Sequence, residues 1–173
     1  MVQKKMAETD LVVSALDETG LPPCSLELEL TEGMVMKQPE EAVNVLKKLK
    51  DLGIKLSIDD FGKGFSSLNY LKLFPIDTLK IDKSFIMNLE KDKASAAIAS
   101  AVVSLAHSLD LKVVAEGAET DEQSLFLSHR SCDFAQGFYI SKPLSPEKVL
   151  LYLSSSNLPC LSIYIKKYEL YKR

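Results

Sequence analysis

Several residue types are scarce in this sequence, which has 3 cysteines, 2 histidines and no tryptophan among 173 residues. Cys24, Cys132 and Cys160 lie far apart at irregular intervals, which suits neither a disulfide framework nor a zinc site and predicts a reducing cytoplasm. Apolar runs reach only a few residues, so no span across a bilayer is predicted. The start, MVQKKMAETD, lacks the apolar region of a secretory signal.

Basic residues are never concentrated, because no basic stretch exceeds two residues and the formal net charge is -3. A slightly acidic chain of this kind has little with which to hold a nucleic-acid backbone, so no nucleic-acid partner is expected. The apolar content of 46% supports a folded core, and 173 residues suffice for one core rather than two. We therefore expect one domain.

Short apolar stretches alternate with amphipathic ones along the chain. The predicted strands are 25–30, 55–60, 77–82, 111–115 and 132–136. The predicted helices are 2–18, 39–52, 67–74, 94–109, 121–129 and 145–153. In helix 94–109 we expect Ile98, Val102, Leu105 and Leu109 to form the packed side, with small residues allowing close approach to a sheet. The alternation predicts a parallel sheet built from βαβ units.

Polar residues collect where the predicted strands end. These residues are Glu29, Glu32, Asp59, Asp60, Lys80, Asp82, Glu116, Glu119 and Gln136. The carboxyl ends of parallel strands share one face, where α/β sheets and barrels keep their active sites. Crowded carboxylates stay ionised beside a cation, and their hard oxygen atoms favour magnesium or manganese. The residues alone indicate a barrel-like metal-dependent hydrolase or lyase and leave its substrate open.

A single acid after a strand is usually a helix cap or a loop charge, and we interpret Asp82 and Glu90 in this way. The adjacent pair Asp59 and Asp60 is followed by glycines, which suits close approach to a ligand. Lys80 alternates with apolar neighbours and points away from them. Inside a barrel, only a charged partner would justify that position.

Five segments together resemble the EAL-domain cyclic di-GMP phosphodiesterases: LELELTE, SIDDFGKGFSS, DTLKIDKSFI, VVAEGAET and CDFAQGFYISKP. Their order and spacing agree with the family across residues 20–153, which is far more specific than one glycine-rich loop. The resemblance implies an α/β fold, the (β/α)8 TIM-like barrel of the EAL type, in a cytoplasmic bacterial signalling protein. It also implies hydrolysis of cyclic di-GMP to linear pGpG by water attack assisted by two ions, Mg²⁺ or Mn²⁺.

The motif positions of the family map onto this chain one by one. The resemblance implies that Glu29, Asp59 and Asp60 bind metal, and that Glu32 steadies the DDFG loop. It implies catalytic roles near the metals and the attacking water for Lys80, Glu116, Glu119 and Gln136. A protonated lysine among carboxylates would stabilise charge that develops at phosphorus.

The loop after the aspartate pair departs from the family, in which a threonine or an alanine stands at the position of Lys63. The family uses this loop for coupling between the metals and for dimer contacts, and a charge there would affect either. We expect the Lys63 side chain to be solvated instead.

The Glu-Ala-Leu motif of the family and the strand with its metal-binding asparagine are absent. A whole barrel takes about 250 residues, so we expect an incomplete barrel of about five strands. Residues 1–153 would form the C-terminal part of an EAL domain, and 154–173 a tail outside the family pattern. Missing ligands weaken a metal site, and missing strands leave two open sheet edges. We expect a homodimer or a higher oligomer, or pairing by the stretch LSIYIKKY, to cover the edges.

Three functions remain open on the sequence. The chain is the C-terminal part of a cyclic di-GMP phosphodiesterase, with little or no hydrolysis in this truncated form and with room for an upstream sensory or GGDEF domain. Alternatively, it is a catalytically inactive cyclic di-GMP-binding or protein-interaction module. The third function, an unrelated metal-dependent barrel enzyme, is disfavoured by the motifs.

Overall fold

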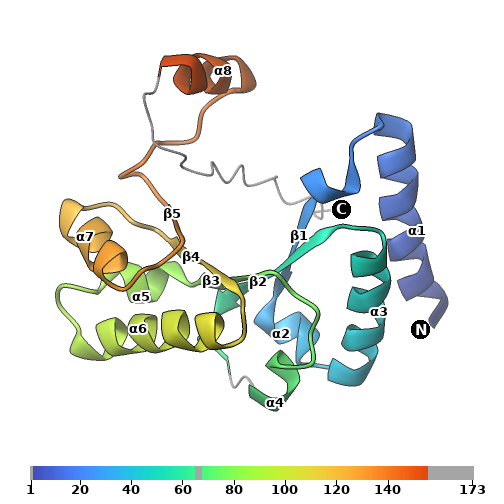
Figure 1. Cartoon of the computed structure of the whole chain (residues 1–173), viewed down its shortest axis with the longest axis horizontal. Coiled ribbons are helices and arrows are strands. Elements are labelled where there is room, and N and C mark those ends of the chain that lie inside the picture. The colour runs from blue at the N-terminus through green and yellow to red at the C-terminus, as the bar shows by residue number, and fades with distance from the viewer. Residues whose placement is uncertain (1, 65–67, 156–173) are drawn as a thin grey trace.

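The computed structural model of the chain describes residues 2–64 and 68–155. Five strands form one parallel sheet in the order β1-β2-β3-β4-β5. They are β1 (Glu27–Thr31), β2 (Lys55–Phe61), β3 (Thr78–Ile81), β4 (Lys112–Glu116) and β5 (Phe134–Gln136). Each strand lies beside the next in chain order, as in the wall of an α/β barrel (Figure 1). The predicted α/β fold is confirmed, as an incomplete barrel with β1 and β5 at the edges of the described sheet.

Helices occupy the connections between the strands. They are α1 (Val2–Thr19), α2 (Glu32–Val35), α3 (Pro39–Asp51), α4 (Leu68–Leu71), α5 (Lys83–Met87), α6 (Lys93–Ser108), α7 (Asp121–His129) and α8 (Pro146–Ser155), with a 3-10 turn at Pro23–Ser25. The six predicted helices are all present, although the one predicted at 67–74 is helical only at Leu68–Leu71 in the described residues. Two one-turn helices, α2 and α5, were not predicted, because four or five residues are too few to show a helical period.

The helix ends follow ordinary capping chemistry. Pro39 opens α3, where its fixed φ suits the first turn and no hydrogen bond is lost. Asp92 caps α6 by accepting hydrogen bonds from the backbone N–H groups of Ala94 and Ser95. Thr120 and Gln123 form a reciprocal capping box at the start of α7. These local signals fix the places where helices begin, and thereby the lengths of the loops at the carboxyl ends of the strands.

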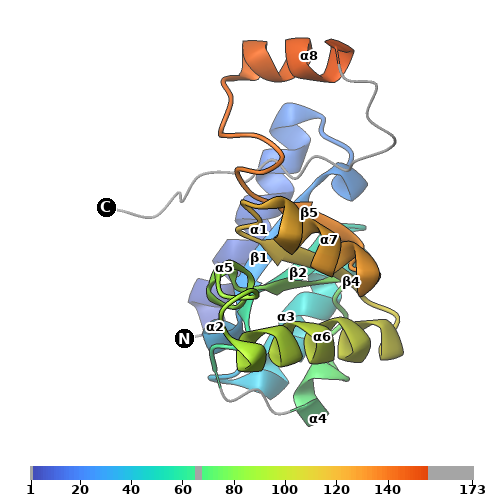
Figure 2. The same cartoon turned by 90° about the vertical axis from the view of Figure 1, so that its left-hand side faces the viewer.

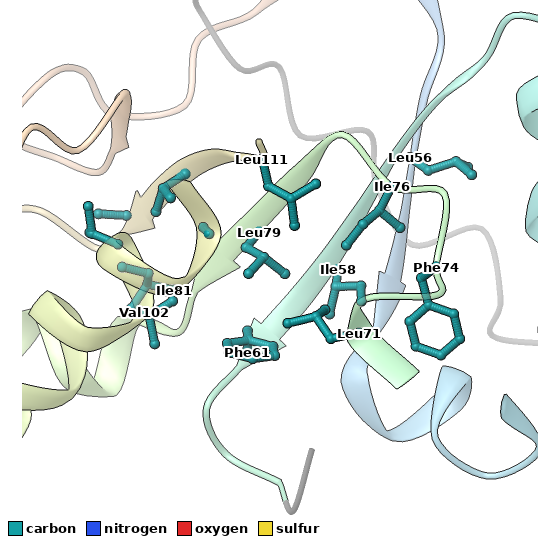
Figure 3. Packing of buried hydrophobic residues seen from close by; sticks show 14 of the residues in the cluster. Leu56, Ile58, Phe61, Leu71, Phe74, Ile76, Leu79, Ile81, Val102 and Leu111 are labelled. Carbon is teal, nitrogen blue, oxygen red and sulfur yellow. The ribbon is translucent and has the colours of Figure 1, made fainter. Parts of the chain in front are cut away.

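The two faces of the sheet differ in chemistry. Strand registry places Leu30, Ile58 and Leu79 at one level, and side chains alternate along each strand. This parity forms an apolar face, with Leu56, Ile58, Leu79 and Ile81, that packs with Val102 of α6 in one core (Figure 3). Val113 and, from α3, Leu46 and Leu49 belong to the same core. The opposite face carries the other parity, with these residues: Glu29, Ser57, Asp59, Thr78, Lys80, Glu116 and Gln136. The sheet thus separates a helix-covered core from a polar face.

The packed side of α6 agrees with the prediction except at Ile98. Its buried residues are Ser95, Ala99, Val102, Val103 and Ala106, whereas Ile98 is 38% exposed. The small side chains let the helix backbone come close to β3 and β4, which buries them in preference to the large Ile98. The expected close approach is present, and three residues of the expected side, Val102, Leu105 and Leu109, do pack on the core.

α8 lies apart from the sheet in both views (Figures 1 and 2). Within the described residues, no helix combines the length and the apolar character needed to cross a membrane. Cys24 and Cys132 are free thiols. Cys160 and the predicted LSIYIKKY strand lie outside the described residues, as does most of the predicted tail at 154–173.

Candidate active site

Lys80 is the centre of the polar face. Its side chain is 0% exposed, and its Nζ lies 2.6 Å from Glu29 Oε1 and 2.6 Å from Glu116 Oε1. Asp59 Oδ1 is 3.6 Å from the same nitrogen. These carboxylates come from β1, β4 and β2, so four adjacent strands contribute to one cluster. The charged partners expected for an inward-pointing lysine are therefore present.

The protonation of Lys80 results from two opposing effects. Burial disfavours its charged form, but the contacts with Glu116 and then Glu29 outweigh burial and hold the pKa of Lys80 above its ordinary value. The lysine is therefore an ammonium ion across the physiological pH range. Its positive charge compensates carboxylates that would otherwise repel one another.

A bulge at the end of β2 sends the two adjacent aspartates in different directions. The pairing of β2 with β3 shifts between Ile58 and Phe61, so that one extra residue enters β2. Asp60 has a left-handed φ of 57°, which aspartate tolerates better than most residues do, and its N–H donates to Asp59 Oδ1 at 2.9 Å. Asp59 consequently faces Lys80, whereas Asp60 faces the following loop.

Glu32 holds that loop. It is 3% exposed at the start of α2, and its Oε2 accepts hydrogen bonds from the N–H groups of Gly62 at 3.0 Å and Gly64 at 3.3 Å. A Cβ atom at position 64 would lie 2.5 Å from Glu32 Oε1, so a larger residue there would have to displace the carboxylate. This geometry agrees with the loop-steadying role that the resemblance implies for Glu32.

Gln136 and Glu119 lie at the far side of the cluster. Gln136 pairs with Glu116 in the registry of β4 and β5, and its carbonyl accepts hydrogen bonds from the N–H groups of Gly117 and Ala118. Its Oε1 is buried and has no hydrogen-bond partner among the described residues. Glu119 is exposed in the loop after β4, and the ion pairs of Lys80 do not include it in the described structure. The structure therefore gathers Glu29, Asp59, Lys80, Glu116 and Gln136, and leaves Glu119 at the rim.

Lys63 is half-exposed, in keeping with the expectation that it is solvated, but it also makes two ion pairs that the sequence did not predict. Its Nζ lies 2.7 Å from Asp82 Oδ2 and donates a hydrogen bond to Asp60 Oδ1 at 3.0 Å. Asp82 is the N-cap of α5, as the sequence indicates, and accepts from the N–H of Ser84 at 2.9 Å. The sequence could have indicated the contact with Asp60, because Lys63 follows that residue by three positions and lies between two glycines. It could not indicate the contact with Asp82, which is remote in sequence.

The donor chemistry of the cluster suits a hard divalent cation, but its geometry does not. Within the described residues, no group of three or more His, Cys, Asp or Glu side chains is arranged to hold a metal ion. Asp59 lies beside the ammonium of Lys80, and Asp60 is hydrogen-bonded to that of Lys63. The carboxylates are compensated by lysines in this arrangement.

Comparison with known proteins agrees with the geometry. The family described as EAL domain matches residues 3–143. The cyclic di-GMP phosphodiesterase NbdA of Pseudomonas aeruginosa is 47% identical over 135 residues, which are 78% of this chain and 17% of that protein. The signaling protein YkoW of Bacillus subtilis is 46% identical over 138 residues, 80% of this chain and 17% of that protein. The chain thus spans less than a fifth of the length of these relatives.

Solved structures give the same result. The structure described as "PaMucR Phosphodiesterase, c-di-GMP complex" superposes with a TM-score of 0.80 at 44% identity, covering 82% of this chain and 57% of that one. The EAL domain of DcpA from Mycobacterium smegmatis gives a TM-score of 0.78 at 40% identity, covering 86% and 66%. The polar cluster at the carboxyl ends of the strands, the family match and these superpositions together show that this chain belongs to the EAL domain family.

Proposed function

We propose that this chain is the C-terminal part, residues 1–153, of a cyclic di-GMP phosphodiesterase domain, followed by a tail at 154–173. The observation that carries the proposal is the convergence of Glu29, Asp59 and Glu116 on the buried Lys80. The relatives named above support the substrate, because NbdA is a cyclic di-GMP phosphodiesterase and the MucR structure is a cyclic di-GMP complex.

The reaction adds water to one phosphodiester of cyclic di-GMP. The water oxygen forms a bond to phosphorus, the bond between phosphorus and the ribose 3′ oxygen breaks, and that oxygen leaves as a hydroxyl, giving linear pGpG. Lys80 fixes the carboxylates, and the buried Gln136 Oε1 is free to accept a hydrogen bond from a bound water. Glu116 is the base that we propose for that water, and Glu119 a support at the rim. A complete site would use Mg²⁺ or Mn²⁺ with Glu29, Asp59 and Asp60.

A second function has its own observation. The described carboxylates are paired with lysines and are not arranged around a metal. This favours a catalytically inactive module that binds cyclic di-GMP or another protein. In either case we propose a cytoplasmic bacterial signalling role, assembly as a homodimer or higher oligomer, and a parent protein with a sensory or GGDEF domain.

Calorimetry and product analysis separate these functions. Cyclic di-GMP is titrated into the 173-residue chain in Ca²⁺, and hydrolysis is followed by chromatography in Mg²⁺ or Mn²⁺. The matched variants are Glu116→Gln in the site and Lys48→Met on α3, an exposed lysine at the opposite end of the strands.

Each outcome has one meaning. Saturable binding with formation of pGpG that Glu116→Gln lowers and Lys48→Met does not would support the phosphodiesterase. Saturable binding without pGpG would support the cyclic di-GMP-binding module, and absence of binding would contradict both the phosphodiesterase and that module, leaving only the protein-interaction form of the second function.

A further inference from the structure

Lys63 joins the loop after β2 to the start of α5. Its Nζ lies 2.7 Å from Asp82 Oδ2 and 3.0 Å from Asp60 Oδ1. Asp82 is 1% exposed, whereas the side chain of Lys63 is 50% exposed. One ammonium group, reached from solvent, therefore neutralises a buried carboxylate and a neighbouring half-exposed carboxylate together.

This bridge holds both of its acidic partners. Burial opposes the ionised form of Asp82, yet hydrogen bonds from Lys63 and Ser84 keep its pKa well below the ordinary range. Asp82 also caps α5, so its charge is fixed in place by the helix N-terminus. The ammonium of Lys63 cannot leave without uncovering a buried charge, which makes its position beside Asp60 persistent.

The consequence concerns Asp60. An ammonium and a divalent ion both require the lone pairs of the same carboxylate, and two positive charges cannot share one oxygen without repulsion. Asp60 Oδ1 is already hydrogen-bonded to Lys63, whereas its neighbour Asp59 faces Lys80. The two aspartates are thus held by different lysines.

We propose that Lys63 is an internal cation that competes with a divalent metal for Asp60 and so sets the metal affinity of the site. The proposal rests on the proposed function only in taking Asp60 as a metal ligand. Lys63 is a positioning residue: it acts on the carboxylate and does not touch the reacting atoms. Removal of the Lys63 ammonium frees Asp60 to bind a divalent ion, whereas a substitution that keeps a positive charge at position 63 does not.

Binding of Mn²⁺ tests this without any assay of activity. The 173-residue chain is titrated with Mn²⁺, and the free ion is followed by its electron paramagnetic resonance signal. Lys63→Met should bind Mn²⁺ at least about tenfold more tightly than the unsubstituted chain, a difference of about 1.4 kcal/mol. Lys63→Arg should bind as the unsubstituted chain does, and so should Lys48→Met, which removes the same charge at the other end of the sheet.

Two double variants keep the test decisive. Lys63→Met with Asp82→Asn removes the buried charge together with its partner, so it should fold, as circular dichroism will show, and still gain affinity. Lys63→Met with Asp60→Asn should lose the gain, because the freed ligand is gone. A general structural role of Lys63 would not depend on Asp60 in this way.

The proposal is overturned if Lys63→Met and Lys63→Met with Asp82→Asn bind Mn²⁺ no more tightly than the unsubstituted chain, including the case in which none binds. Failure of cyclic di-GMP binding with the Mn²⁺ pattern intact would contradict only the proposed function. Hydrolysis with no effect of position 63 on Mn²⁺ affinity would contradict only the role of Lys63.

Discussion

Lys80 is the residue whose removal the structure makes most costly. Lys80→Met leaves Glu29, Asp59 and Glu116 without their shared cation on a largely buried face. Breaking a buried ion pair by removing one partner typically costs about 3–5 kcal/mol, so we expect a loss of that size in the free energy of unfolding at pH 7. Urea denaturation at pH 7 measures it.

The conservative variant Lys80→Arg keeps the charge and should lose less stability than Lys80→Met. An unfolding free energy of Lys80→Met equal to that of the unsubstituted chain at pH 7 would contradict the central role of this lysine.

Position 137, directly after β5, has no room for a side chain. A Cβ atom there would lie 2.0 Å from the carbonyl oxygen of Ala118 and 2.5 Å from its nitrogen, and backbone atoms cannot swing aside. Gly137→Ala should therefore lower the free energy of unfolding by about 3 kcal/mol, near the upper end for overpacking. Gly33→Ala in α2 is the matched control, since a Cβ there meets nothing within 4 Å.

The control should be neutral or stabilising by about 0.5–1 kcal/mol, because alanine loses less entropy than glycine in a helix. Thermal unfolding of both variants gives the comparison. Equal stability of Gly137→Ala and Gly33→Ala would show that the close approach of Gly137 and Ala118 is not maintained.

At the scale of elements, Asp133 ties three segments together at the end of the sheet opposite Lys80. Its carboxylate lies 2.6 Å from Lys112 Nζ and 2.8 Å from His107 Nε2, and accepts from the N–H of Val113 at 3.0 Å. Burial opposes its ionisation, but the bonds from Lys112, His107 and Val113 keep the pKa of Asp133 below its ordinary value. The charged carboxylate therefore links α6, β4 and the start of β5.

Asp133→Asn should lower the free energy of unfolding at pH 7 by about 1.5–3 kcal/mol, as expected for a hydrogen bond to a charged group. A lowered folded-state pKa stabilises above the unfolded value of about 3.9, and this contribution disappears as pH falls through the folded-state pKa. The difference between Asp133→Asn and the unsubstituted chain should accordingly vanish at the acid end. Urea denaturation from pH 7 to pH 2.5 follows it, and a constant difference would refute the assignment.

The helices differ in how well they could be predicted from sequence patterns. Helices with a clear period or a capping signal, such as α3 and α7, could be predicted within a residue or two of their bounds. The one-turn helices α2 and α5 could not, because four or five residues show no helical period, although the cap Asp82 of α5 could be recognised. On the packed side of α6 only the exposure of Ile98 was beyond the pattern, since the distance of the sheet decides whether Ala99 or Ile98 is buried.

At the scale of the whole molecule, the open sheet is the feature with consequences. Among the described residues, β1 and β5 each have a strand on one side only. Unpaired backbone groups on such edges favour pairing with another chain. We expect the isolated 173-residue chain to associate, with a mass by light scattering above that of one chain that falls on dilution. A single-chain mass at every concentration would show that the edges are covered within the chain.

The sequence by itself determined the family, the alternation of strands and helices, and the end of the sheet at which the acidic groups gather, because the registry of parallel strands follows chain order. Local rules also placed Asp82 as a cap and Lys80 opposite the core. Only the tertiary structure decided that Asp59 and Asp60 pair with different lysines, because this depends on the bulge in β2 and on the distance from Lys63 to Asp82. Lys63 lies in a loop, and only its contact with Asp82, which is far from it in the sequence, makes it a partner of the acidic site.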